Sequence, residues 1–213
     1  MDNLKLVVFD MDGLIFDTER LTYKIMRELA NQHGFHFQLD HYKQIIGISE
    51  ETSNNQLIDI YGSRIQSVFK EFPEVYNKSL NKENLHIKPG VMELLDTIEK
   101  KGIKKCIASS SSREVIEHYL KMKDLFNRFD FYVSGTEVVN GKPNPDVFIE
   151  ACHRGNVELG EALVLEDSYN GFKAAVRAGI KCIIVPDLIE PNGEMRELAY
   201  RVCKDLGEVV ELV

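Results

Sequence analysis

Five short apolar runs, rich in β-branched residues and separated by helical patterns, constrain the fold of this chain most. A strand buried on both faces is continuously apolar, whereas a half-buried strand alternates apolar with polar residues. Strands that alternate with helices favour a parallel sheet wrapped by helices, so the sequence predicts an α/β core with a Rossmann-like parallel sheet. The expected strands are Leu4–Phe9, Lys105–Ala108, Phe129–Val133, Ala162–Leu165 and Lys181–Val185.

One long segment after the first strand interrupts this alternation. From about residue 19 to residue 85 the apolar residues recur at helical spacing, as Leu21, Ile25 and Leu29 do, and no strand pattern is present. The sequence therefore predicts an inserted, all-helical cap domain over residues 18–86. The α/β core domain is expected to consist of residues 1–17 and 87–213, and the insertion is the candidate for a lid.

Composition excludes several classes of partner. The chain has 213 residues with 34 acidic and 26 basic side chains, a formal charge of −8, and no dense block of Lys or Arg. Nucleic acid and an anionic membrane are therefore not expected as partners, whereas a bound metal ion suits the acidic balance. The four cysteines lie far apart without a C-x-x-C pair, which favours reduced thiols, three of them in the core, over a zinc site or disulfides.

The beginning of the sequence leads directly into the first strand, without the long apolar segment of a signal peptide or membrane span. The cytoplasm is the expected location. No sequence feature specifies an oligomer, and a monomer that acts on a small molecule is the expectation.

Polar residues follow four of the five predicted strands. These segments are Asp10-Met11-Asp12-Gly13, Ser109-Ser110-Ser111-Ser112, the loop Gly141-Lys142-Pro143, and Glu166-Asp167-Ser168. Each has an ordinary explanation by itself: a turn, a helix cap, a solvated lysine, or acids at a helix N-terminus. Ligands of open α/β sheets bind beyond the carboxyl ends of the strands, where all four segments meet. Together they predict a site.

The serine run is expected to have two different tasks. Ser111-Ser112-Arg113-Glu114 fits the S-x-x-E capping box, which predicts that Ser111 caps the next helix. Ser109 has no such task and stays available for a ligand.

These motifs resemble those of a known family. Asp10-Met11-Asp12-Gly13, a serine after the second strand, the segment G-K-P-N-P-D at 141–146 and E-D-S-Y-N-G at 166–171 resemble the four signature motifs of the haloacid dehalogenase-like hydrolase superfamily. The helical insertion resembles the cap of the subgroup that contains β-phosphoglucomutase and small-molecule phosphatases. The resemblance covers essentially the whole chain.

The resemblance implies a role for each matching residue. Asp10 is expected to be the nucleophile that forms an aspartyl phosphate, and Asp12 the general acid and base. Ser109 is expected to hold a phosphoryl oxygen, assisted by the backbone N–H of Ser110. Lys142 is expected to bind the phosphoryl group and neutralise developing charge.

The resemblance also implies Mg²⁺ as the cofactor. Its ligands are expected to be a carboxylate oxygen of Asp10, the backbone carbonyl of Asp12 and the carboxylate of Asp167. Glu166 is expected to hold a water molecule on the metal. Oxygen-only ligands favour Mg²⁺ over zinc.

The activity implied is Mg²⁺-dependent hydrolysis of a small phosphate monoester, such as a sugar phosphate. A mutase of the β-phosphoglucomutase type is the alternative, but that branch has an arginine where this chain has Glu50 and a histidine where it has Thr22. Glu50 also fits an ordinary acid in the first turn of a helix after Ser49. A non-catalytic phospho-acceptor switch is a remote alternative, because such domains lack a helical insertion after the first strand.

Overall fold

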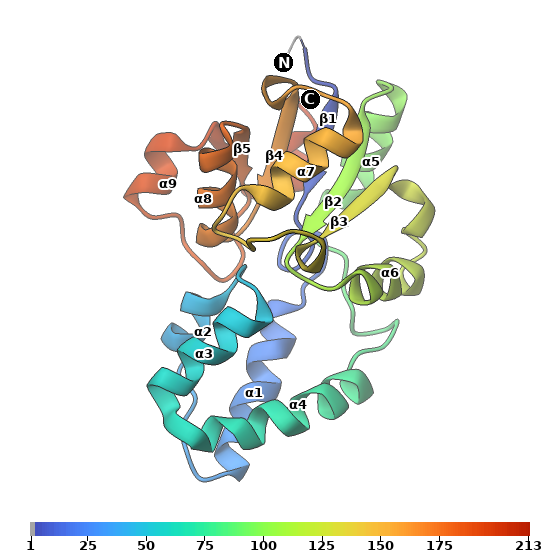
Figure 1. The fold of residues 1–213 in the computed structure, drawn as a ribbon. Coiled ribbons are helices and arrows are strands. Elements are labelled where there is room, and N and C mark those ends of the chain that lie inside the picture. The colour runs from blue at the N-terminus through green and yellow to red at the C-terminus, as the bar shows by residue number, and fades with distance from the viewer. Residues whose placement is uncertain (1–2) are drawn as a thin grey trace.

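The computed structural model describes residues 3–213. Its core is a sheet of six parallel strands in the order β3-β2-β1-β4-β5-β6 (Figure 1). The Rossmann-like α/β core is therefore confirmed. The strands are β1 Leu6–Phe9, β2 Lys104–Ser109, β3 Phe131–Ser134, β4 Ala162–Glu166, β5 Lys181–Ile184 and β6 Arg201–Val202.

All five expected strands are present, and the sixth was not predicted. Strand β6 has only two residues, Arg201 and Val202, and the first of them is exposed. Two residues are too short to show the apolar run by which the other strands were found.

Helices cover both faces of the sheet, because successive strand residues point to opposite sides. Val7 and Phe9 of β1 belong to one apolar cluster with residues of α5, α6 and α10. Leu6 and Val8 belong to a second cluster with residues of α7 and α8. The helices of this part are α5 Val91–Lys100, α6 Arg113–Met122, α7 Asp146–Gly155, α8 Tyr169–Ala178, α9 Gly193–Leu198 and α10 Leu206–Val209.

The segment between β1 and α5 is helical, as predicted, and lies beyond one end of the sheet (Figure 1). Its helices are α1 Glu19–Gln32, α2 Leu39–Ile45, α3 Glu50–Tyr61 and α4 Ile65–Ser79. Short 3₁₀ turns are η1 Gly62–Arg64, η2 Phe126–Arg128, η3 Gly135–Glu137 and η4 Leu159–Glu161.

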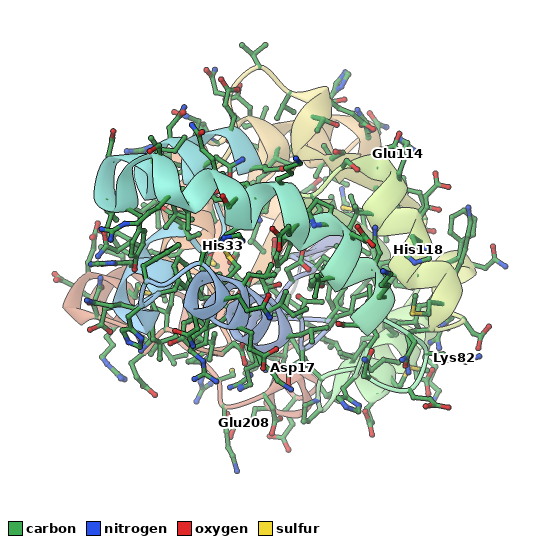
Figure 2. The ribbon with its side chains drawn as sticks, turned by 90° about the horizontal axis from the view of Figure 1, so that it is seen from below. Asp17, His33, Lys82, Glu114, His118 and Glu208 are labelled. Carbon is green, nitrogen blue, oxygen red and sulfur yellow. The ribbon has the colours of Figure 1, made fainter. Side chains whose placement is uncertain are left out.

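Two chain segments connect the four helices to the sheet, and they run side by side. The Asp17 N–H donates to the carbonyl of His86 at 3.0 Å, and the Lys88 N–H donates to the carbonyl of Ile15 at 2.8 Å. Figure 2, seen from below, labels Asp17 just before α1 and Lys82 beyond α4. The two connections are therefore paired antiparallel, with an isolated bridge between Phe16 and Ile87.

None of the helices within residues 3–213 combines the length and the apolar character needed to cross a membrane. The four cysteines are free, and all four are buried rather than the three expected.

Candidate functional site

Three of the predicted site residues meet at the carboxyl ends of β1 and β4. These strands are neighbours, with Phe9 opposite Leu165, so the residues that follow them in register are adjacent. The Lys142 ammonium donates to Asp10 Oδ1 at 2.5 Å and to Glu166 Oε1 at 2.6 Å. All three side chains are buried. Residues separated by more than one hundred positions thus form one buried ionic group.

The second oxygen of Glu166 is held by the start of α8. Glu166 Oε2 accepts hydrogen bonds from the backbone N–H of Asp167 at 3.0 Å, the N–H of Ser168 at 2.9 Å and the Ser168 hydroxyl at 3.0 Å. A Cβ at Gly171 would lie 1.6 Å from Glu166 Oε1, so this helix position requires glycine. Glu166 therefore has a fixed orientation and in turn orients Lys142.

The group contains more acidic than basic side chains, and all of them are buried. Burial raises the pKa of Asp10 to about 8, although Lys142 lowers it in part. Burial, together with the carboxylates of Glu166 and Asp10, raises the pKa of Asp167 well above its usual range. Burial alone would lower the pKa of Lys142, but Asp10 and Glu166 outweigh it and raise that pKa. Lys142 is therefore charged, and one ammonium faces three carboxyl groups.

The donor set fits a hard divalent cation. One carboxylate oxygen from each of Asp10, Glu166 and Asp167 lies within 4.8 Å of the other two. Asp167 Oδ1 is buried and has no hydrogen-bond partner within residues 3–213. A Cβ at Gly13 would lie 2.2 Å from Asp167 Oδ2, so the backbone of the first motif approaches this carboxylate closely. An all-oxygen set with a free carboxylate oxygen suits Mg²⁺.

The side chain of Asp12 is held outside this cluster. The Thr18 hydroxyl donates to Asp12 Oδ1 at 2.7 Å, and the Ser111 hydroxyl donates to Oδ2 at 2.8 Å. Burial raises the pKa of Asp12, and these two hydrogen bonds lower it in part. Asp12 as a residue is half-buried, and the two hydrogen bonds fix the orientation of its carboxyl group.

The serine run differs from the prediction at Ser111. The helix begins at Arg113, and its N-cap is Ser112, whose side chain makes no cap hydrogen bond. Ser111 lies one residue too early, and its hydroxyl donates to Asp12 instead. The prediction that Ser111 caps this helix is therefore wrong. Ser109 is buried at the end of β2, where its hydroxyl oxygen accepts from the Ser111 N–H at 3.1 Å.

The loop between α2 and α3 rests on the core beside this site. The Ser110 hydroxyl donates to the carbonyl of Gly47 at 3.1 Å, and the Asn170 side chain donates to the carbonyl of Ile46 at 2.9 Å. Gly47 has φ +79°, and a Cβ there would lie 2.3 Å from the Ser168 hydroxyl oxygen. Glycine therefore permits this close approach.

Glu50 is exposed in the first turn of α3. The Thr52 N–H donates to the Ser49 hydroxyl oxygen at 3.4 Å, which makes Ser49 the N-cap. This is the ordinary helix-start environment expected for Glu50.

Several residues of the site were not predicted from sequence. Thr18 and Ser111 fix Asp12, and Tyr42 donates a hydrogen bond to Glu19, the first residue of α1. The available signal was the polar triplet Asp17-Thr18-Glu19, which directly follows the apolar run Leu14-Ile15-Phe16. The predictions treated this triplet only as the beginning of the helical insertion.

The raised pKa values predict a pH-dependent stability of the metal-free protein. Asp10 has an ordinary pKa of 3.8 and about 8 when folded, so the folded state binds the extra proton between these values and stability falls as pH rises. Between pH 6 and 8 the free energy of unfolding should fall by about 2 kcal/mol in the presence of a chelator. Urea unfolding at several pH values measures this slope.

Excess Mg²⁺ should remove most of this dependence of the free energy of unfolding on pH. A bound cation favours the charged form of the Asp10 and Asp167 carboxyl groups. The variant Asp10→Asn should likewise flatten this dependence in the chelator. An equal slope with and without Mg²⁺ would contradict a metal site at these carboxylates.

Comparison with known proteins identifies the family. The model of the haloacid dehalogenase-like hydrolases matches residues 7–185. The chain is 35% identical over 182 residues to the "Phosphorylated carbohydrates phosphatase" of Thermotoga maritima, covering 84% of each chain. It is 32% identical over 201 residues to the Bacillus subtilis protein named "Putative phosphatase YhcW", covering 87% of this chain and 85% of that one.

A solved structure agrees over the whole chain. The crystal structure described as "putative beta-phosphoglucomutase from Thermotoga maritima" superposes with a TM-score of 0.74 at 29% identity, covering 98% of each chain. By its parallel sheet the chain is an α/β protein. Its candidate site is the ionic group of Asp10, Lys142 and Glu166 at the carboxyl ends of β1 and β4. The chain belongs to the haloacid dehalogenase-like hydrolases, as its four motifs indicated.

Proposed function

We propose that this protein hydrolyses small phosphate monoesters, such as sugar phosphates, through a phosphorylated Asp10, with Mg²⁺ as cofactor. The observation that supports it is the buried group in which Lys142 bridges Asp10 and Glu166 beside the unpartnered oxygen of Asp167. The relatives named as phosphatases support the same activity.

Asp10 has the position required of the nucleophile. A carboxylate oxygen attacks phosphorus, the bond from phosphorus to the leaving oxygen breaks, and an aspartyl phosphate forms. Lys142 holds the Asp10 carboxylate and offsets the negative charge that gathers on the phosphoryl oxygens. Ser109 and the backbone N–H of Ser110 would bind a phosphoryl oxygen. Mg²⁺ held by Asp10, the Asp12 carbonyl and Asp167, with a water held by Glu166, would supply further positive charge.

Asp12 has the position required of the acid and base. Protonated Asp12 gives its proton to the leaving oxygen while Asp10 becomes phosphorylated. Ionised Asp12 then takes a proton from water as that water attacks phosphorus, and the bond from phosphorus to Asp10 breaks. Inorganic phosphate leaves, and Asp10 and Asp12 return to their starting states.

The helical segment 18–86 would act as a cap over this site. The loop at Ile46 and Gly47 touches Ser110 and Asn170 through two hydrogen bonds, which the segment can break when it moves away. Opening would admit the substrate, and closing would exclude water. We assign residues 1–17 and 87–213 to the core domain.

A mutase is the second candidate function, supported by the structural likeness to the β-phosphoglucomutase homologue. A mutase must hold a second phosphate, which requires a cation on the cap. Glu50 lies at the position where the mutase branch has an arginine, and a carboxylate there repels a phosphate. Hydrolysis is therefore favoured.

The test is a Mg²⁺-dependent assay over a panel of small phosphate esters, followed by phosphorus NMR. The panel includes β-glucose 1-phosphate with and without a bisphosphate primer. We expect release of inorganic phosphate that stops when the metal is removed with a chelator. Conversion of β-glucose 1-phosphate to the 6-phosphate without net release would instead establish the mutase. Absence of turnover on every ester would contradict both activities.

A further inference from the structure

The helical segment presents a row of uncharged hydroxyl groups and one carboxyl group toward Asp12. The row consists of Glu19 and Thr22 on α1, Tyr42 on α2 and Tyr76 on α4, and Tyr119 on α6 continues it into the core. Two sets of contacts place the row near Asp12. The Thr18 hydroxyl, next to Glu19, donates to Asp12 Oδ1 at 2.7 Å. Phe16 pairs with Asp12 in an isolated β-bridge, and the Tyr119 ring packs edge-on against Phe16 with ring centroids 5.9 Å apart. The row therefore lies near the proposed acid and base.

Glu19 begins the row with one oxygen bound and one free. The Tyr42 hydroxyl donates to Glu19 Oε2, whereas Oε1 has no hydrogen-bond partner in the described part of the chain. Glu19 and Thr22 both keep partial exposure, and three positions apart on α1 they share one face of that helix. Glu19 Oε1 and the Thr22 hydroxyl are thus available to bind a ligand.

Tyr76 and Tyr119 join the helical segment to the core. The Tyr119 hydroxyl donates to the Tyr76 hydroxyl oxygen at 2.9 Å, and both side chains are buried. Figure 2 shows α4 beside α6, on which Glu114 and His118 are labelled. Because Tyr119 is the donor, the Tyr76 proton remains free for another acceptor. Tyr119 therefore joins the row only when the helical segment lies against the core, as it does in this structure.

The neighbouring cations are engaged elsewhere. Arg20 pairs with Asp17 at 2.8 Å and with the buried Asp187, and Lys88 pairs with Asp187 at 2.5 Å. Lys142 is bound by the carboxylates of the core. None of the four residues Glu19, Thr22, Tyr42 and Tyr76 carries a positive charge. The row itself thus offers hydrogen-bonding groups and no cation.

We propose that Glu19, Thr22, Tyr42 and Tyr76 select the leaving group: they bind one that carries uncharged hydroxyls and reject one that carries a second phosphate. The inference rests on the proposed function, since the row lies over Asp12, the group that protonates the leaving oxygen. A site that hydrogen-bonds substrate hydroxyls discriminates against substrates lacking them, because its own polar groups then lose their partners. A second phosphate would lose its hydration against these groups without gaining a cation from the row.

The experiment compares kcat/KM for glucose 6-phosphate, p-nitrophenyl phosphate and fructose 1,6-bisphosphate. Tyr42→Phe and Glu19→Gln should lower kcat/KM for glucose 6-phosphate about tenfold, mainly through KM, the loss expected for one hydrogen bond. Both variants should change the value for p-nitrophenyl phosphate, whose leaving group has no hydroxyl, less than about twofold. The wild type should prefer glucose 6-phosphate to the bisphosphate at least about threefold. An equal kcat/KM for these two substrates would overturn the rejection of a second phosphate.

Tyr169→Phe is the matched control. The Tyr169 hydroxyl donates to Glu194 at 2.5 Å on the core, in a tyrosine and glutamate pair like that of Tyr42 and Glu19. Its removal should leave all three values unchanged. Equal losses on glucose 6-phosphate and p-nitrophenyl phosphate in Tyr42→Phe, or no loss on either, would overturn the proposed selection.

A binding measurement separates this inference from the proposed function. Titration calorimetry measures the binding of glucose 6-phosphate and of methyl phosphate to the Asp10→Asn variant. This measurement does not require turnover. Adding Tyr42→Phe should weaken binding of glucose 6-phosphate about tenfold and leave methyl phosphate unchanged. A wild type that hydrolyses no ester contradicts the proposed function alone, whereas unchanged binding of glucose 6-phosphate contradicts the hydroxyl row.

Discussion

Replacing Asp10 with asparagine should abolish phosphate release, with a fall in kcat on the order of 10⁴-fold or more. The asparagine amide is not nucleophilic, so the aspartyl phosphate cannot form. The fold should persist, because Lys142 keeps its bond to Glu166 at 2.6 Å and a buried carboxylate with a raised pKa is removed. The measurements are phosphate release with Mg²⁺ and the melting temperature of the variant.

Asp124→Asn provides the control for this prediction. Asp124 is exposed, pairs with Lys82 at 2.7 Å and has φ 58°, a conformation that asparagine also tolerates. This variant should retain full activity. Mass spectrometry of wild-type protein quenched during turnover should find a phosphoryl group on the peptide that contains Asp10. A folded Asp10→Asn variant with more than a few per cent of wild-type activity would exclude Asp10 as the nucleophile.

The sequence was most informative about the sheet. Buried parallel strands are continuously apolar, and this pattern located the first five strands to within a few residues. It also predicted that Asp10, Lys142 and Glu166 would approach one another, because the carboxyl ends of parallel strands share one edge. The hydrogen bonds of Lys142 to the side chains of Asp10 and Glu166 in the structure agree with this convergence. The short strand Arg201–Val202 was missed because it carries no pattern.

The contacts between the helical segment and the core could not be predicted from the sequence pattern. Tyr76 and Tyr119 are separated by 43 positions, and their contact depends on how α4 packs against α6. The capping motif at Ser111 gave a wrong prediction for a related reason. A local pattern indicated a helix cap, but Asp12, at a distance of 99 positions, accepts the hydrogen bond of that hydroxyl. Tertiary packing therefore determines which of two possible partners a hydroxyl group takes.

Replacing Asp12 with asparagine should lower steady-state turnover about 10²–10⁴-fold, the range of general acid and base catalysis. Thr18 and Ser111 hold the Asp12 oxygens at 2.7 and 2.8 Å, and their hydroxyls can reorient to accept from an amide. The variant should therefore fold, and its melting temperature measures this. The asparagine side chain can neither protonate the leaving oxygen nor take a proton from water.

The two roles of Asp12 can be separated by the choice of leaving group. Nitrophenolate leaves without a proton, so Asp12→Asn should still transfer a phosphoryl group from p-nitrophenyl phosphate to Asp10. The next step needs a base, so the phosphoryl group should remain on Asp10. Stopped-flow measurements should therefore show a burst of about one nitrophenolate per protein molecule, followed by slow turnover. The double variant with Asp10→Asn should show no burst. Steady turnover of Asp12→Asn at the wild-type rate would show that Asp12 is not the base.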